Sequence, residues 1–515
     1  MNIPWISLLT FLPLLGGFVL IGSDSAKPDR ARRFALGISL ASAALALTIA
    51  ARFDGTLESL QFVERYAWIP TMNAEYFVGL DGIGLLMVVL SALVVPVAIL
   101  TSWNVAARPH LYFALVLLLE SGLFGAFTAL SFFHWFLFWE LSLIPAFFLI
   151  KLWGGAGRGP ASTQFFVYTM AGSVALLVAF AAIMLATGSS DFIKLAEAAR
   201  TGALRTAIDQ LNWAGLSGNQ IAMLLCGGIL FGFAVKVPLM PFHSWLPATY
   251  TEAPTGTTIL LTGAMSKMGM YGFLRILLPL FPGQLNQMMT PLLLLAVATI
   301  VCSAAAAFAQ KDLKRIFAYS SINHLGYCLL GTFAVAGSTG NEASPIEKAA
   351  ALNGVVLQMF NHGLTATALF CFIGFIERRT GGARSIDGFG GLRKVAPVFC
   401  GLMGITLFAS LGLPGLNGFV GEFLIFKGSF PLAGWAVAWS SLGLLISAVF
   451  LLTILQRVFH GPLNPQWTGF SDLGWGERWV VIPGTILMFL FGLWPQLLIG
   501  VLNPTVTRLV AAIGP

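Results

Sequence analysis

Charged residues are scarce in this chain. Only 10% of its 515 residues are Asp, Glu, Lys or Arg, whereas 57% are hydrophobic. Soluble domains contain about 25% charged residues. The composition therefore excludes an ordinary soluble protein and predicts an all-α protein that crosses a membrane many times. No stretch long and polar enough for a large soluble domain is present.

Cysteine is also scarce, and no two cysteines stand close together. The five lie in or beside apolar runs, at Cys226, Cys302, Cys328, Cys371 and Cys400. Without a CxxC spacing, neither a metal nor an iron–sulfur cluster is indicated, and small buried side chains are the expected role. The sequence also lacks a glycine-rich phosphate loop, a nucleotide fingerprint and a Ser-His-Asp arrangement. We therefore expect no cofactor in this chain and no redox chemistry by the chain alone.

Long apolar runs dominate what is present. A membrane-spanning helix needs about 20 mostly apolar residues, and fourteen segments meet that requirement. They are residues 3–22, 34–52, 79–101, 111–130, 132–151, 163–187, 219–239, 256–279, 290–309, 315–336, 352–376, 397–428, 435–459 and 479–502. The first has no basic leader and is expected to be a span instead of a cleaved signal. The seventh and twelfth are interrupted by proline.

Basic residues predict how the chain sits in the membrane. The loops between odd- and even-numbered spans contain sixteen Lys and Arg, besides the borderline Arg478, and the opposite side contains seven. Because Lys and Arg concentrate on the cytoplasmic side, we expect both termini to face outward. The net charge of +7 reflects this topology, and no basic aromatic tract indicates a nucleic-acid partner. On the outer side, residues 189–218 contain an amphipathic pattern that predicts a short surface helix.

Seven ionisable residues stand inside the apolar runs. These seven are the candidates for a function, among other ionisable residues nearer the ends of the runs: Glu120, Glu140, Lys236, Lys267, His324, His362 and Glu422. Such residues are costly in hydrocarbon, face the protein interior and mark ion or proton routes. A buried Glu and Lys that can approach and separate form a proton switch, because an opposite charge favours the charged form and burial disfavours it. Histidine titrates near neutral pH and can pass a proton between such groups.

Each of these residues also has a static interpretation. A lone histidine in a membrane helix often serves only as a hydrogen-bonding contact between helices, which applies most to His362. Glu120 fits either a static ion pair or a group that tunes proton transfer. Three carboxylates, two lysines and two histidines exceed what helix contacts require and favour a proton route. His243 is expected at the cytoplasmic mouth, and Lys427, at the end of its span, is expected to reach the membrane interface.

Two proline-containing interruptions of the apolar runs resemble each other in sequence. Lys236-Val-Pro-Leu-Met-Pro-Phe242 and Leu413-Pro-Gly-Leu-Asn-Gly-Phe419 lie five spans apart, and an odd offset inverts the second copy. Broken helices paired in inverted repeats indicate a transporter site. A lysine beside such a break predicts a buried, charge-handling point, because loose backbone at membrane depth needs protein or water around it.

Four stretches resemble the proton-pumping, antiporter-like membrane subunits of respiratory complex I, in particular the M (chain 4) type. They are Phe138–Pro145, Ala234–Pro254, Asp312–Gly326 and Gly412–Phe423. The resemblance implies about fourteen helices with two inverted five-helix repeats. The implied parts are helices 1–3 in residues 1–110, repeats in 111–280 and 289–460, and a last helix in 478–515. One departure is Ala248-Thr-Tyr-Thr-Glu252-Ala-Pro, which lacks the family's usual histidine.

The same resemblance implies a function. Glu140 would pair with Lys236, Lys267 would follow with His324, and Glu422 would release protons outward. Other subunits, with FMN and iron–sulfur clusters, would pass electrons from NADH to quinone. Neighbouring antiporter-like subunits and the bilayer are the implied partners, in the inner membrane of a bacterium.

Other functions fit the same residues. The main alternative is a subunit of a multi-subunit Na⁺/H⁺ antiporter, which shares the repeat and the charges but has no redox partner. Related alternatives are the equivalent subunit of a hydrogenase or of a photosynthetic complex. In a third, the chain is a scaffold whose charges are structural. A lining of the quinone site is a fourth, although the family places quinone at a different subunit.

Overall fold

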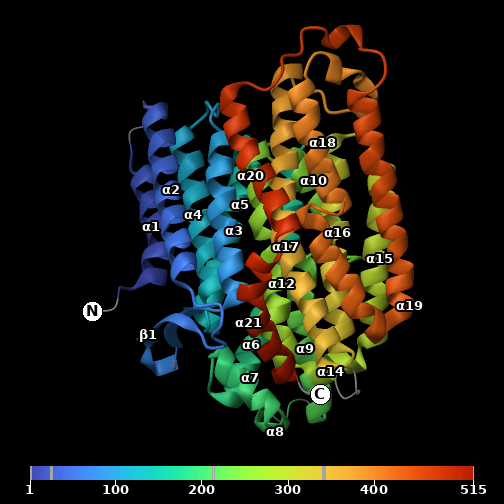
Figure 1. The fold of residues 1–515 in the computed structure, drawn as a ribbon. Helices are drawn as coiled ribbons and strands as arrows, with labels where there is room; N and C mark the ends of the chain where they lie inside the picture. Colours follow the sequence, from blue (N-terminus) through green and yellow to red (C-terminus); the bar gives the residue numbers. More distant parts are fainter. Residues whose placement is uncertain are drawn as a thin grey trace.

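Long helices standing side by side make up the molecule (Figure 1). The computed structural model describes residues 3–23, 27–72, 74–211, 213, 215–338 and 344–513. Within them, eleven helices are long and apolar enough to cross a membrane, and two shorter apolar helices accompany them. The predicted all-α polytopic membrane fold is therefore confirmed.

The first six predicted spans correspond to single helices. They are α1 (Trp5–Ile21), α2 (Pro28–Arg52), α3 (Gly82–Thr101), α4 (Pro109–Thr128), α5 (Phe132–Trp153) and α6 (Arg158–Thr187). The surface helix predicted within residues 189–218 is present as α7 (Phe192–Arg200), and α8 (Ala203–Asp209) follows it. Asp191 begins α7, because its side chain accepts the backbone N–H groups of Ile193 and Lys194.

The seventh span is broken, as its prolines predict. Helix α9 (Gly218–Lys236) ends at Lys236, and α10 (Trp245–Glu252) begins after eight non-helical residues. Pro238 and Pro241 lie in this gap and have no N–H to donate to a helix. The eighth span consists of α11 (Thr255–Leu260), α12 (Lys267–Gly272) and α13 (Leu278–Leu280), joined by the π-helical turns η2 (Leu261–Met265) and η3 (Phe273–Leu277).

The second half of the chain contains the other predicted break. Its helices are α14 (Pro282–Gln287), α15 (Met289–Phe308), α16 (Leu313–Ala336), α17 (Pro345–Thr380), α18 (Pro397–Leu411) and α19 (Asn417–Ile454). Short turns add η4 (Ile386–Gly388), η5 (Leu392–Lys394), η6 (Leu455–Phe459) and η7 (Pro465–Trp467). The break around Pro414 separates α18 from α19, and α19 turns sharply at Ala433. Helix α19 therefore includes the end of the twelfth predicted span and most of the thirteenth.

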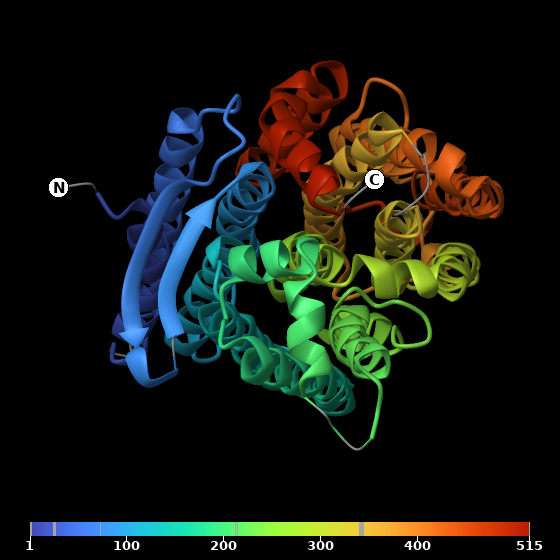
Figure 2. The ribbon, with the colours of Figure 1, turned by 90° about the horizontal axis from the view of Figure 1, so that it is seen from below.

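Two features differ from the sequence-based expectation. Strands β1 (Gln61–Ile69) and β2 (Ala74–Leu80) form an antiparallel hairpin that was not predicted. Seen from below, it lies along the outside of the first helices (Figure 2). The single span predicted over residues 479–502 is instead two helices, α20 (Trp475–Leu493) and α21 (Gln496–Ile513). They stand one above the other (Figure 1), parted at Pro495, whose missing N–H ends the hydrogen-bond ladder.

The bundle has two distinguishable ends. Its upper end in Figure 1 includes α10 and the loop before α20, and its lower end includes the hairpin, α7 and α8. Helix α1 begins and α21 ends towards the lower end. In the interior, the most apolar stretch of α17 is fully buried and that of α4 nearly so. Glu120 on α4 and His362 on α17 are therefore enclosed by protein.

Candidate functional site

Lys236 is the last residue of α9, at the edge of the helix break. Its side chain is only 3% exposed. Within the described part of the chain, its ammonium makes neither a hydrogen bond nor an ion pair. It lies instead over the ring of Trp139, 4.7 Å from the centroid. A cation on an aromatic face in a desolvated site gains about 2 kcal/mol, so Trp139 holds the charge where hydrocarbon would not.

Glu140 follows Trp139 on α5 and lies close enough to act electrostatically on Lys236. The direct Glu140–Lys236 pair that the sequence implied is not formed, and the buried Oε1 of Glu140 has no hydrogen-bond partner among the described residues. The two charges are therefore near each other but apart, with the indole ring on the ammonium.

Lys267 is held quite differently. It begins α12 between the two π-helical turns, which are frequent at functional sites. Its ammonium donates to the carbonyl of Thr262, to Oγ of Ser266 at 3.2 Å and to Nδ1 of His362 at 2.8 Å. Two residues further on, Gly269 lets this helix approach α9, since a Cβ there would lie 3.2 Å from that of Lys236. The two lysines therefore belong to adjoining helix turns.

His362 on α17 lies between Lys267 and His324. The two imidazole rings are 5.3 Å apart between centroids. The resemblance implied a step from Lys267 to His324, with His362 as a secondary candidate, whereas in the structure Lys267 contacts His362 and the ring of His362 lies beside that of His324. A signal was available, because Gln358, His362 and Thr365 recur at helical spacing on one face of an otherwise apolar helix.

His324 on α16 connects the histidines to Glu422. Its Nδ1 lies 3.0 Å from Oε1 of Glu422, and its Nε2 lies 3.1 Å from Oγ of Ser410. The amide of Gln358 also donates to Glu422, at 3.1 Å. Gly412, in the second helix break, has φ = +77°, and a Cβ there would lie 2.8 Å from Oε2 of Glu422. Glycine at 412 thus provides both the left-handed turn and room for the carboxylate.

Two small cavities border the histidines. Each has a volume of about 10 Å³, which is the size that holds one water. One is lined by Ser320 and Ser321 besides the two histidines, and the other reaches Glu422. A water-sized space therefore exists where the two imidazoles face each other without a direct bond.

Glu120 and two further histidines stand apart from this series. Glu120 on α4 is fully buried, and neither of its carboxylate oxygens has a hydrogen-bond partner among the described residues. His243 is half-buried within the break after α9. The sequence did not single out His134, which is buried on α5 and packs edge-on against Tyr76 at 4.7 Å. Lys427 is exposed near the turn of α19, as expected.

The described residues contain no group of three or more His, Cys, Asp or Glu that could hold a metal ion. The cysteines described in the structure are all unpaired. What the site offers is a row of side chains that can each bind and release a proton.

Comparisons with known proteins agree with this geometry. Residues 129–450 match the family described as "NADH:quinone oxidoreductase/Mrp antiporter, TM". NADH-quinone oxidoreductase subunit M of Rhodobacter capsulatus is 36% identical over 510 residues, covering 98% of this chain and 96% of the relative.

Solved structures give the same result. A chain of respiratory complex I from Thermus thermophilus with bound NADH superposes with a TM-score of 0.85 at 28% identity, over 99% of this chain and 100% of that chain. A chain of the Mrp complex from Dietzia sp. DQ12-45-1b has a TM-score of 0.81 at 21% identity, over 100% of both chains, and shows the shared fold alone. This chain therefore belongs to the NADH:quinone oxidoreductase/Mrp antiporter family, among the subunit M type of the antiporter-like membrane subunits of complex I.

Proposed function

We propose that this chain moves protons across the membrane along a series of six interior side chains. The series is Glu140, Lys236, Lys267, His362, His324 and Glu422. As a subunit M, the chain is a membrane part of a proton-translocating NADH:quinone oxidoreductase, and other membrane subunits of that complex are its partners. Electron transfer from NADH to quinone, with its FMN and iron–sulfur clusters, is assigned to other subunits. The observation that supports the route best is the succession of contacts from Lys267 through both histidines to Glu422.

The proposed orientation follows the basic residues. The upper end, where the loops contain sixteen Lys and Arg against seven on the other side, faces the cytoplasm of a bacterium. Both termini then face outward across the inner membrane. The two broken helices, α9/α10 and α18/α19, run in opposite directions (Figure 1), which supports inverted repeats over residues 111–280 and 289–460.

The transfer begins at the separated Glu140–Lys236 pair. When quinone reduction elsewhere in the complex brings Glu140 to Lys236, the ammonium gains an opposite charge in place of an aromatic face alone. When Glu140 withdraws, the buried lysine releases its proton towards Lys267. Lys267 is within hydrogen-bond distance of Nδ1 of His362, so a proton passes there directly. One water in the small cavity beside the imidazoles carries the proton from His362 to His324. Glu422 receives it from His324 and releases it outward.

Substitution of Lys236 tests this route. Lys236→Ala in the assembled complex should abolish proton pumping driven by NADH oxidation in membrane vesicles, because it removes the ammonium that holds the proton beside Trp139 and Glu140. Lys427→Ala is the matched control, since Lys427 is exposed at the other end of the series. Full proton pumping by Lys236→Ala would disprove the route.

A subunit of an Mrp-type antiporter is the second candidate, because the Dietzia chain has the same fold. The 36% identity to a subunit M over 98% of the chain favours the oxidoreductase. Purification of the assembled complex separates the two functions. Flavin and iron–sulfur subunits should copurify with this chain, and purification with small membrane subunits alone would indicate the antiporter.

A further inference from the structure

A cleft of about 300 Å³ opens at the upper end of the bundle, between the ends of α3 and α17 and the start of α11. Its lining includes Ser102, Pro254, Thr255 and Glu377. Glu377 is in the last turn of α17, and its side chain is 20% exposed. It is therefore an acid that reaches water through the cleft while most of its surface is covered by protein.

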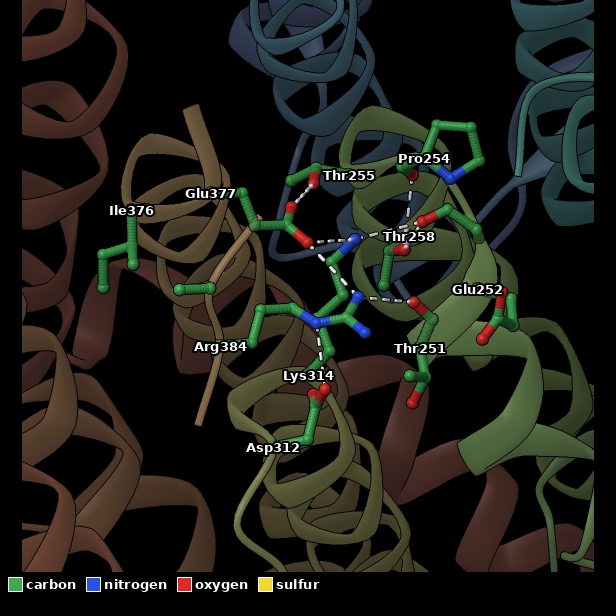
Figure 3. Close-up of polar contacts among 12 residues, drawn as sticks. Thr251, Glu252, Pro254, Thr255, Thr258, Asp312, Lys314, Ile376, Glu377 and Arg384 are labelled. Atoms are coloured by element: carbon green, nitrogen blue, oxygen red, sulfur yellow. Dashed lines mark hydrogen bonds and ion pairs between the residues drawn. The ribbon is translucent and has the colours of Figure 1, made fainter. Parts of the chain in front are cut away.

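Glu377 is the centre of a polar cluster that closes the break between α10 and α11 (Figure 3). Its Oε1 lies 3.2 Å from the ammonium of Lys314 and 3.3 Å from Nη1 of Arg384. Its Oε2 accepts the hydroxyl of Thr255 at 2.8 Å. Arg384 in turn pairs with Asp312 at 2.9 Å. The carboxylate thus joins α16, α17 and the loop after α17 to the first residue of α11.

A row of buried hydroxyls runs from this cluster towards Lys267. Its members are Thr258, Thr262 and Ser266, which recur every four residues and share one helix face. At the upper end, Thr258 Oγ1 and Lys314 Nζ both donate to the carbonyl of Ala253, at 3.4 and 3.2 Å.

At its other end, the row of hydroxyls reaches Lys267, a member of the proposed series. Thr262 contacts the hydroxyl of Ser321 at 3.1 Å, and Lys267 donates to Ser266 at 3.2 Å. The Cβ atoms of neighbouring members are one helical turn apart, at about 5–6 Å, and the hydroxyls of Thr258 and Ser266 donate to backbone carbonyls instead of to each other. The row therefore leads from the cluster at the cleft to Lys267, with a gap that one water molecule can span between successive hydroxyls.

We propose that Glu377 is the proton-collecting carboxylate of this subunit. It takes a proton from water in the cleft and delivers it along Thr258, Thr262 and Ser266 to Lys267. One water molecule stands between successive hydroxyls of the row, and each hydroxyl and each water accepts one proton and donates another. One proton moves per passage, and no bond other than O–H or N–H changes. The charged groups that face Glu377 are Lys314 and Arg384, and Arg378 lines the same cleft. The inference rests on the proposed function, because Lys267 is the acceptor.

Glu377→Gln tests the inference in inverted membrane vesicles, where the cytoplasmic face meets the medium. Glutamine keeps the size of the side chain but binds no transferable proton. The initial pumping rate should fall about tenfold, and the loss should deepen as the pH of the medium rises, because protons become scarcer at the cleft. Added formate, a carboxylic acid small enough for the cleft, should restore pumping, and Glu377→Asp should retain most of it.

Glu477→Gln is the matched control. Glu477 is also bound by two arginines, Arg378 and Arg379, and is 21% exposed, but it is on α20 and does not line the cleft. Its replacement should leave the pH profile of pumping unchanged, with no response to formate.

The outcomes distinguish this inference from the proposed function. If Glu377→Gln pumps like the parent, or loses pumping that neither formate nor Glu377→Asp restores, then Glu377 only fastens the helix break and the inference is wrong. If Lys236→Ala does not pump in the same vesicles, the proposed function stands and only the role of Glu377 is wrong. Normal pumping by Lys236→Ala as well would overturn the proposed function itself.

Discussion

Two buried lysines of this chain differ in how their charge is held. Lys267 has two oxygen acceptors and an imidazole, whereas Lys236 has only the face of Trp139 and the nearby Glu140. A cation with few fixed partners depends more on any group that moves, because burial removes the compensation that water would give. We therefore expect movement of Glu140 to change the proton affinity of Lys236, whereas Lys267 receives the proton at a fixed position in the proposed route.

Replacement of His362 tests whether the series continues through α17. In His362→Gln, the amide can still accept a hydrogen bond from Lys267 but cannot take up and release a proton. Proton pumping by membrane vesicles should fall about tenfold or more. His134→Gln is the control, since His134 is equally buried but is outside the series. If His362→Gln pumps at the parental rate, His362 is only a structural hydrogen-bonding contact between helices.

Trp139 offers a test of the separated Glu140–Lys236 pair. Its ring covers the Lys236 ammonium, and its indole N–H donates to Oγ of Ser173 at 3.0 Å. Trp139→Leu should destabilise the complex by about 2 kcal/mol, measured as a lower temperature of dissociation, and Trp139→Phe should cost less. Trp435→Leu, at an exposed position on α19, should have little effect. Equal stability of Trp139→Leu and the parent would contradict a stabilising cation–π contact.

The sequence singled out most residues of the proposed series as candidates, but not their order in space. Glu140, Lys236, Lys267, His324 and Glu422 could be predicted because a charge inside an apolar run is rare and costly. The helical spacing of Gln358, His362 and Thr365 indicated a polar face on α17, but not that this face lies between Lys267 and His324, because tertiary packing sets which elements it meets. The Trp139 contact was also unpredictable, since it requires the relative position of α5 and α9.

At the scale of elements, breaks signalled by proline were predictable and those set by tertiary contacts were not. The two broken helices could be predicted from Pro238, Pro241 and Pro414, because proline has no backbone N–H to donate to a helix. Pro495 has the same effect between α20 and α21, but the run around it is apolar enough to resemble one span.

The hairpin escaped prediction because its β1 strand is largely exposed and has no clean apolar alternation. The buried carboxylate of Glu64 fastens it to the start of α1 through the N–H of Ile6, at 2.7 Å. Such an anchor follows from packing against α1, which the local sequence of the strand does not reveal.

Close packing of α4 and α5 gives a prediction for elements. A Cβ added at Gly122 would lie 2.8 Å from the backbone N and 3.0 Å from Cα of Ser142. Gly122→Ala should separate the two helices and destabilise the complex by about 1–3 kcal/mol. Gly227→Ala is the control, because a Cβ there meets nothing within 4 Å on α9. The dissociation temperature measures both, and equal temperatures would show that α4 and α5 can part without cost.

Across the whole molecule, the two helix breaks lie at the two ends of one polar series. Lys236 stands at the first break and Glu422 shortly after the second, with α12, α17 and α16 supplying the residues between them. Large apolar side chains such as Trp439, Leu445 and Trp479 face outward instead. A polar interior enclosed by an apolar exterior allows protons to move inside the protein without contact with lipid.

The orientation of the whole bundle is tested by where reporter enzymes fold. Alkaline phosphatase needs disulfides and is active only on the oxidising outer side of a bacterial inner membrane. Fused after α21, it should be active, because that helix ends at the lower face. Fused after Gly461, in the loop before α20 at the upper face, it should be inactive, since that end has the excess of Lys and Arg. The opposite pattern would reverse the bundle, so that Glu377 would face outward and could not collect protons from the cytoplasm.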